Sequence, residues 1–160
     1  RAAGSARHGT GLSPRSVQAR ESDRARLWLA TMRRRASSAT IRHMRPTVLI
    51  VDDHPAFRES ASALLEAEGF AVIGAAADGA QAIAAVERLR PQIVLLDIQL
   101  PDLAGFAVAE RLAAGPNAPR VVLISSRDAA AYGPRLEAAA ARGFLPKREL
   151  SGTALAALVR

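Results

Sequence analysis

The sequence of 160 residues contains no cysteine and a single lysine. Without cysteine the chain has no disulfide and no thiolate ligand, which suits a reducing, cytoplasmic compartment. The three histidines stand too far apart along the chain to predict a zinc cluster. No run of eighteen apolar residues occurs, so no membrane-spanning helix is predicted. P-loop and dinucleotide fingerprints are also missing, which leaves nucleotide chemistry without support.

The basic charge that the chain does carry is concentrated at its start. The formal net charge is +7. Residues 1–45 hold eleven arginines and two acidic residues, whereas residues 46–160 hold eleven basic and thirteen acidic side chains. We predict that residues 1–45 form an Arg-rich leader without stable structure. Two interpretations of this leader stay open: contact with nucleic-acid or lipid phosphates, and an extension without a partner.

From Pro46 onward, short apolar runs alternate with amphipathic segments. The predicted strands are 48–51, 70–75, 93–96, 121–124 and 144–146. The predicted helices are 55–68, 79–90, 103–113, one within 129–142 that Gly133-Pro134 shortens, and 151–159, which Ser151 caps. Near-continuous apolar strands that alternate with helices predict an α/β domain over residues 46–160, with a doubly wound parallel sheet of five strands.

Polar residues follow four of these predicted strands. They are Asp52 and Asp53, Asp97, Ser125 and Ser126, and Lys147. Because the carboxyl ends of parallel strands meet at one edge of a sheet, these side chains should converge there. Adjacent carboxylates repel each other, and a bound cation is the commonest reason for keeping them together. Asp52, Asp53 and Asp97 therefore predict a Mg²⁺ site.

The same edge predicts phosphoryl chemistry. Asp97 leaves an apolar strand for a loop, where its carboxylate can attack phosphorus to form an acyl phosphate. Lys147 supplies a positive charge for the phosphoryl oxygens, and the Ser125 hydroxyl can donate a hydrogen bond to one of them. Individually, Asp53 could instead cap a helix and Ser125 could open one; together the strand-end residues favour a phosphoacceptor site.

These residues resemble the receiver domains of two-component response regulators. The matching elements are Asp52-Asp53, Asp97 followed by Pro101 and Gly105, Ser125, and Phe144 with Lys147 three residues on. The resemblance covers residues 46–160. It implies a flavodoxin-like (βα)5 fold with strand order 2-1-3-4-5. It also implies Mg²⁺-dependent phosphorylation of Asp97 by a sensor histidine kinase.

The resemblance extends to further roles. It implies that the Gln99 backbone carbonyl contacts Mg²⁺ and that Ser125 and Phe144 act as a switch, although Phe144 as plain core stays open. The surface of the fourth helix, fifth strand and fifth helix would then contact a downstream protein or a second copy of the chain.

The segments DDHPAFR and RGFLPKREL are similar to receivers that carry a helix-turn-helix output domain. The 160 residues end at the fifth helix, so DNA binding through such a domain is not carried over to them. A single-domain regulator and a truncated transcriptional regulator both stay open. Arg148 stands where many receivers have a proline, so no cis bond is expected after Lys147.

A phosphohydrolase with an aspartyl nucleophile is the competing function. Such enzymes usually carry a second aspartate two residues after the nucleophile, where this chain has Gln99. They also usually carry a cap insertion, for which 160 residues hardly leave room. We therefore predict a phosphoacceptor and not an enzyme with turnover, and Mg²⁺ as its only cofactor.

A chain that begins at Met44 should melt at the same temperature as the longer chain and take up phosphate equally well, because every core-forming segment follows Met44. Thermal unfolding and intact-mass measurements on both chains check this. A clear drop in melting temperature for the shorter chain would show that the Arg-rich leader packs on the domain.

Overall fold

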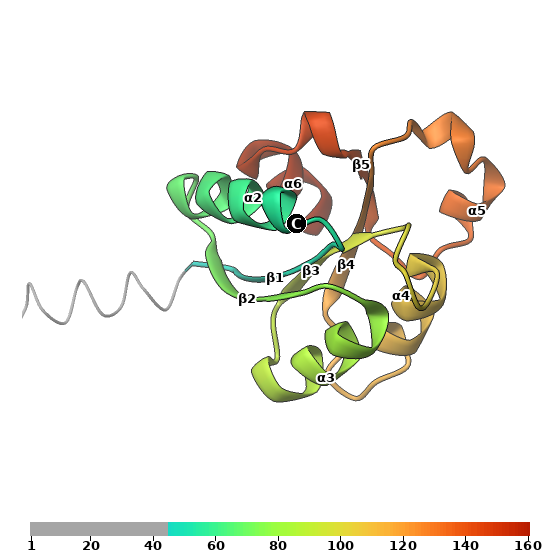
Figure 1. The fold of residues 1–160 in the computed structure, drawn as a ribbon, viewed down its shortest axis with the longest axis horizontal. Helices are drawn as coiled ribbons and strands as arrows, with labels where there is room; N and C mark the ends of the chain where they lie inside the picture. Colours follow the sequence, from blue (N-terminus) through green and yellow to red (C-terminus); the bar gives the residue numbers. More distant parts are fainter. Residues whose placement is uncertain (1–44) are drawn as a thin grey trace, which may run out of the picture. The chain divides into compact units, whose positions relative to one another are not determined.

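Five parallel strands form one sheet in the order β2-β1-β3-β4-β5 (Figure 1). The strands are β1 (Thr47–Val51), β2 (Ala71–Ala76), β3 (Ile93–Asp97), β4 (Arg120–Ser125) and β5 (Gly143–Pro146). The computed structural model describes residues 45–160, so the predictions about the Arg-rich leader lie outside the described residues. The predicted sheet, with its strand number and order, is confirmed.

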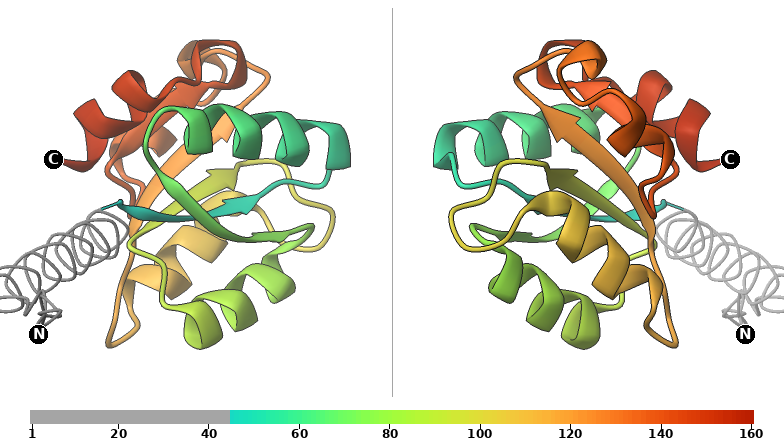
Figure 2. Two further views of the ribbon diagram at one scale, coloured as in Figure 1. Left: turned by 90° about the vertical axis from the view of Figure 1, so that its left-hand side faces the viewer. Right: turned by 90° about the vertical axis from the view of Figure 1, so that its right-hand side faces the viewer.

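Helices cover both faces of the sheet. They are α2 (Pro55–Ala67), α3 (Gly79–Leu89), α4 (Gly105–Ala113), α5 (Pro134–Glu137) and α6 (Gly152–Val159), with short 3-10 turns η1 (Ala129–Ala131) and η2 (Lys147–Glu149). Figures 1 and 2 show α2 and α6 on one face and α3 and α4 on the other. Among the helices of residues 45–160, none has the length and apolar character needed to cross a membrane.

The strand residues divide into two hydrophobic cores because successive side chains point to opposite faces. Leu49, Val94 and Leu96 pack with helices α3 and α4. Ile50 and Leu95 pack on the other face with α2 and α6. Strands β1 and β3 are apolar on both faces because both faces are covered. The buried centre of the sheet therefore fixes where its strand ends lie.

The helix ends follow their local sequences. Helix α2 starts with Pro55 in the first position, where a missing backbone N–H costs nothing. Its N-cap is His54 and not Asp53. Asp78 and Ser151 cap α3 and α6 through side-chain hydrogen bonds to backbone N–H groups three residues on.

Helix α5 is short, as predicted, and helix α4 begins later than predicted. The segment 129–142 contains only η1 and the four-residue α5, because Gly133 adopts a positive φ of 52° and Pro134 restarts the helix. This agrees with the shortening predicted from Gly133-Pro134. Helix α4 begins at Gly105, two residues later than predicted, because the preceding loop closes back on β3.

Gly105 sets the path of the chain after Asp97. Its N–H donates to the carbonyl of Ile98 at 2.9 Å. A Cβ atom at this position would lie 2.3 Å from the carbonyl oxygen of Asp97 and 2.7 Å from the Cα of Ile98. Both atoms belong to the backbone, which cannot rotate away. The close approach therefore requires glycine.

Gly105→Ala should lower the free energy of unfolding by about 1–3 kcal/mol, since the added methyl group overpacks against backbone. Urea denaturation measures the change. Gly115→Ala is the matched control, because a Cβ there would meet only the Leu112 carbonyl oxygen at 3.4 Å. Equal stability of the two variants would contradict the close approach.

Candidate functional site

The predicted strand-end residues converge at one edge of the sheet. Asp52 follows β1, Asp97 ends β3, Ser125 ends β4, and Lys147 follows β5 as the first residue of η2. Asp52, Asp97 and Ser125 are the buried polar residues of the described part of the chain. Burial of ionisable groups is costly unless they are paired, so the contacts among these side chains decide what the site can do.

Lys147 bridges the two buried carboxylates. Its Nζ lies 2.5 Å from Asp52 Oδ2 and 2.7 Å from Asp97 Oδ2. The Asp52 side chain is fully buried, and only 12% of the Lys147 side chain is exposed. The Nζ atom also lies 4.7 Å from the centre of the Phe57 ring, a favourable cation–π distance. Helix α2 thus helps to hold the lysine between strands β1 and β3.

Burial and pairing shift the pKa values of this cluster. Burial raises the pKa of Asp97 above its usual value, and the hydrogen bonds from Lys147 and from the Gln99 N–H only partly offset the increase. For Lys147, burial acts to lower the pKa, but the adjoining carboxylates of Asp52 and Asp97 outweigh it, so the pKa is raised. The lysine therefore stays charged at neutral pH.

The carboxylates fit a divalent cation. Ligand atoms of Asp52, Asp53, His54 and Asp97 lie within 4.8 Å of one another. Asp52 Oδ2 is buried, and the Lys147 ammonium is the charged group that it contacts. Asp52, Asp53 and Asp97 face a single lysine, which leaves a surplus of negative charge, and carboxylate oxygen is the ligand that Mg²⁺ prefers.

Asp53 and His54 form the exposed rim of this cluster. Asp53 is 39% exposed, and its Oδ1 lies 2.7 Å from His54 Nδ1. The His54 backbone N–H donates to Asp52 Oδ1 at 2.9 Å. His54 is the N-cap of helix α2, and its ring lies beside the acidic pair.

The loop after Asp97 is tied to the site and to helix α3. The backbone N–H of Gln99 donates to Asp97 Oδ1 at 3.0 Å. Further along, the Asp102 carboxylate accepts hydrogen bonds from the N–H groups of Gly79 and Ala80 at 2.8 and 2.9 Å. The first of these bonds contributes most to a lowered pKa of Asp102. This second cap of α3 could not be predicted from the sequence, because its partners lie over 20 residues away.

Ser125 contacts Tyr132, which was not among the predicted site residues. Its Oγ lies 2.6 Å from Tyr132 Oη and accepts from the backbone N–H of Arg127 at 3.1 Å. The Tyr132 ring packs between Phe106 and Phe144, with ring centres 6.0 and 5.9 Å away. Phe144 is half-buried and belongs to this aromatic group. The role of Phe144 as a switch stays a prediction.

Arg148, next to Lys147, turns away from the cluster. Its guanidinium pairs with Asp128 and Glu149, all three side chains being more than half exposed. The backbone of residues 45–160 contains no cis peptide bond, so the bond after Lys147 is trans, as expected from Arg148.

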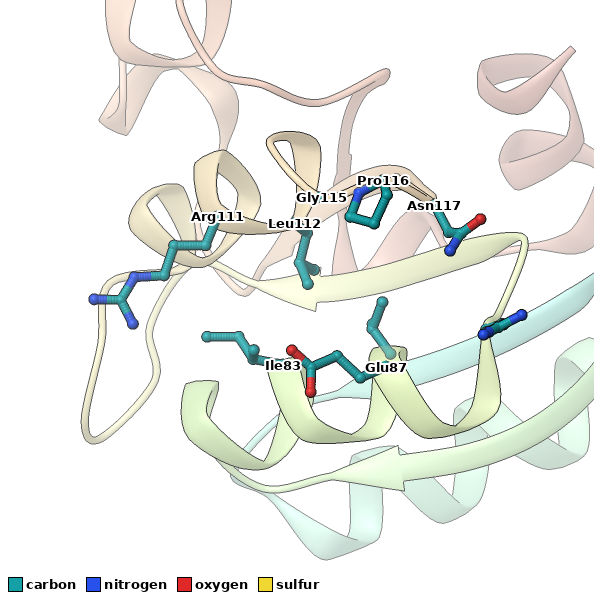
Figure 3. A pocket seen from close by; sticks show the side chains of 9 residues that line it. Ile83, Glu87, Arg111, Leu112, Gly115, Pro116 and Asn117 are labelled. Carbon is teal, nitrogen blue, oxygen red and sulfur yellow. The ribbon is translucent and has the colours of Figure 1, made fainter.

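A separate pocket lies far from this chemistry. About 300 Å³ in volume, it lies between helices α3 and α4 and the loop after α4 (Figure 3). The lining residues include Ile83, Glu87, Arg90, Arg111 and Leu112. No member of the strand-end cluster lines it. Its residues precede β3 and β4, whereas ligands of such sheets bind beyond the carboxyl ends.

The family is shown by comparison with known proteins. A family model described as the response regulator receiver domain matches residues 48–159. The chain belongs to this family, the receiver domains of two-component systems, and the resemblance stated from the sequence is confirmed. Receiver domains of this family bind Mg²⁺ at an acidic pocket.

Relatives and solved structures agree with this membership. A Pseudomonas aeruginosa protein named as a candidate transcriptional regulator is 40% identical over 111 residues, 69% of this chain and 54% of the relative. The DNA-binding response regulator MtrA of Mycolicibacterium smegmatis is 45% identical over 87 residues, 53% of this chain and 37% of the relative. The chain thus spans about half, or less, of the length of these curated relatives.

Among solved structures, a LuxR-family two-component response regulator from Aurantimonas is 28% identical with a TM-score of 0.65, over 72% of this chain and 85% of that chain. The chemotaxis response regulator CheY4 of Vibrio cholerae has a TM-score of 0.64 at 21% identity, over 72% and 99% of the two chains. The latter likeness supports the fold alone.

Replacing Lys147 by methionine should lower the free energy of unfolding by about 3–5 kcal/mol at neutral pH without divalent cations, since two buried carboxylates lose their counter-charge. Chemical denaturation measures the effect. Arg148→Met, at an exposed ion pair one residue away, should cost about 1 kcal/mol or less. Similar losses in both variants would show that the bridge contributes little.

Proposed function

We propose that this domain accepts a phosphoryl group on Asp97 from the phosphohistidine of a sensor histidine kinase. One observation carries the proposal: Lys147 holds the buried carboxylates of Asp52 and Asp97 together at the ends of two strands. An Asp that needed only to close a turn would not require a buried lysine. Membership in the receiver family supports the same role.

The proposed reaction uses the residues as they lie. A carboxylate oxygen of Asp97 attacks phosphorus, the P–O bond forms as the P–N bond breaks, and the imidazole leaves with the bonding electrons. The Gln99 N–H and Lys147 Nζ each hold one Asp97 oxygen, which fixes the orientation of the carboxylate. Lys147 also remains beside the incoming phosphoryl oxygens as a positive charge.

Asp52, Asp53 and Asp97 would hold Mg²⁺, with the backbone carbonyl of Gln99 as a further ligand. The cation would offset the negative charge of the carboxylates and of the phosphoryl group. The convergence of their carboxylate oxygens at this edge supports the assignment. We propose that Ser125 donates a hydrogen bond to the phosphoryl group after the transfer. The ring of Phe144 would then change its position together with Ser125, and the two residues would form the switch.

Output would proceed through protein contacts. The surface formed by α5, β5 and α6 is the proposed docking face for a downstream protein or a second copy. DNA would be reached only through an output domain of the kind that the name of MtrA indicates for that protein. Residues 1–45 remain a proposed leader before a receiver domain of residues 46–160, and we place the protein in the cytoplasm.

Acetyl phosphate with Mg²⁺ should add one phosphoryl group to the chain, and Asp97→Asn should abolish the adduct completely because the nucleophile is lost. Intact-mass spectrometry reads out both chains. Asp128→Asn, which alters an exposed aspartate, serves as control and should keep the adduct. An adduct on Asp97→Asn would overturn the assignment. Continuous phosphate release without a persistent adduct would instead favour the phosphohydrolase.

Mg²⁺ should raise the melting temperature because it binds the folded state; at a hundred times the Kd the gain is about 2.7 kcal/mol. Asp53→Ala should remove most of this gain, whereas Glu59→Ala, at an exposed acid on α2, should retain it. Thermal unfolding with and without Mg²⁺ tests the pair. Equal Mg²⁺ stabilisation of both variants would place the cation elsewhere.

A further inference from the structure

Tyr132 is the only tyrosine of the chain. It follows η1 directly, and its hydroxyl reaches the fully buried Ser125 Oγ at 2.6 Å. The ring is fixed on two sides by Phe106 and Phe144. Arg135 lies 4.6 Å from the centre of the Phe106 ring and closes the aromatic group from outside. This packing places the Tyr132 hydroxyl where it meets Ser125.

The hydrogen bonds available to Ser125 are few. A serine hydroxyl has one proton to donate and two lone pairs to accept with. The N–H of Arg127 occupies one lone pair. Among the hydrogen bonds of residues 45–160, none joins Asp97 to Ser125. The two Asp97 oxygens accept from the Gln99 N–H and from Lys147 Nζ instead. Tyr132 Oη is therefore the acceptor within reach of the buried Ser125 proton.

We propose that Tyr132 is a positioning residue that competes with the phosphoryl group for the Ser125 proton. This inference rests on the proposed function of Asp97. In the ligand-free state Ser125 donates to Tyr132, whose half-buried side chain can donate in turn to water. When a phosphoryl group occupies Asp97, the Ser125 proton turns to it. Tyr132 then reverses its role and donates to the free lone pair of Ser125.

The cost of removing the tyrosine hydroxyl is unequal in the two states. In the ligand-free state the buried Ser125 proton would lose its acceptor, which is expensive. In the liganded state the Ser125 proton is bound by the phosphoryl oxygen. Removing the tyrosine hydroxyl would then leave only the second lone pair of Ser125 without a donor. Tyr132 thus stabilises the ligand-free state and restrains phosphoryl uptake, so its removal should favour uptake.

The test is a double-mutant cycle with beryllofluoride and Mg²⁺ as the phosphoryl mimic, measured by calorimetry on the full chain. Tyr132→Phe keeps the ring between Phe106 and Phe144. It should tighten beryllofluoride binding about three- to tenfold, the effect of one hydrogen bond. In the Ser125→Ala background the same change should leave affinity unaltered. Unchanged or weaker binding in Tyr132→Phe, or equal tightening in both backgrounds, would overturn the proposal.

A second readout follows the single tyrosine directly. The intensity ratio of the tyrosine doublet in the Raman spectrum reports whether the phenol accepts or donates a hydrogen bond. On addition of beryllofluoride and Mg²⁺ this ratio should move from the acceptor toward the donor pattern, and it should not move in Ser125→Ala. A ratio that stays constant in the native chain would overturn the competition. If the native chain takes up no beryllofluoride, the proposed function of Asp97 fails together with this inference.

Discussion

The site depends on one lysine that lies between two buried carboxylates. Lys147 comes from the turn after β5, whereas Asp52 and Asp97 come from the ends of the two central strands. Like charges this close, in a place almost without solvent, would force one carboxyl group to take up a proton or the strands to separate. The lysine prevents both outcomes. It also leaves the charge balance incomplete, because the rim carries Asp53 as well, and a divalent cation would offset this surplus of negative charge.

The fold serves this cluster by placing strand ends rigidly. Apolar side chains on both faces of β1 and β3 lock the strands between two helical layers, so the carboxyl ends cannot drift apart. Gly105 then lets the loop after Asp97 close on Ile98. On the far side, the Ser125 hydroxyl at the end of β4 contacts Tyr132, whose ring packs against Phe144. The proposed hydrogen bond from Ser125 to a phosphoryl group on Asp97 would connect the charged cluster to this aromatic group near α5.

Much of this could be predicted from the sequence, because the decisive signals are local. Alternation of apolar strands and helices predicted the sheet, and polar residues after strands predicted which side chains converge, with Asp52, Asp97 and Lys147 at the centre. The contacts of Tyr132, Phe57 and Asp102 could not be predicted, since each one depends on the packing of segments distant in sequence. Tyr132 lies in an irregular segment whose path is set by Gly133 and not by periodicity. The late start of α4 also depends on a contact between segments, the hydrogen bond from the Gly105 N–H to the carbonyl of Ile98 just after β3.

The most direct test is a crystal structure of the chain with Mg²⁺ and beryllofluoride. The account predicts density for the adduct on a carboxylate oxygen of Asp97. We also expect a cation held by Asp52, Asp53 and Asp97, and a Lys147 ammonium that has turned from Asp97 to the adduct. A structure in which the adduct or the cation lies elsewhere, with Lys147 still bridging Asp52 and Asp97 as in the free chain, would contradict the central claim that this buried charge cluster is built to receive a phosphoryl group.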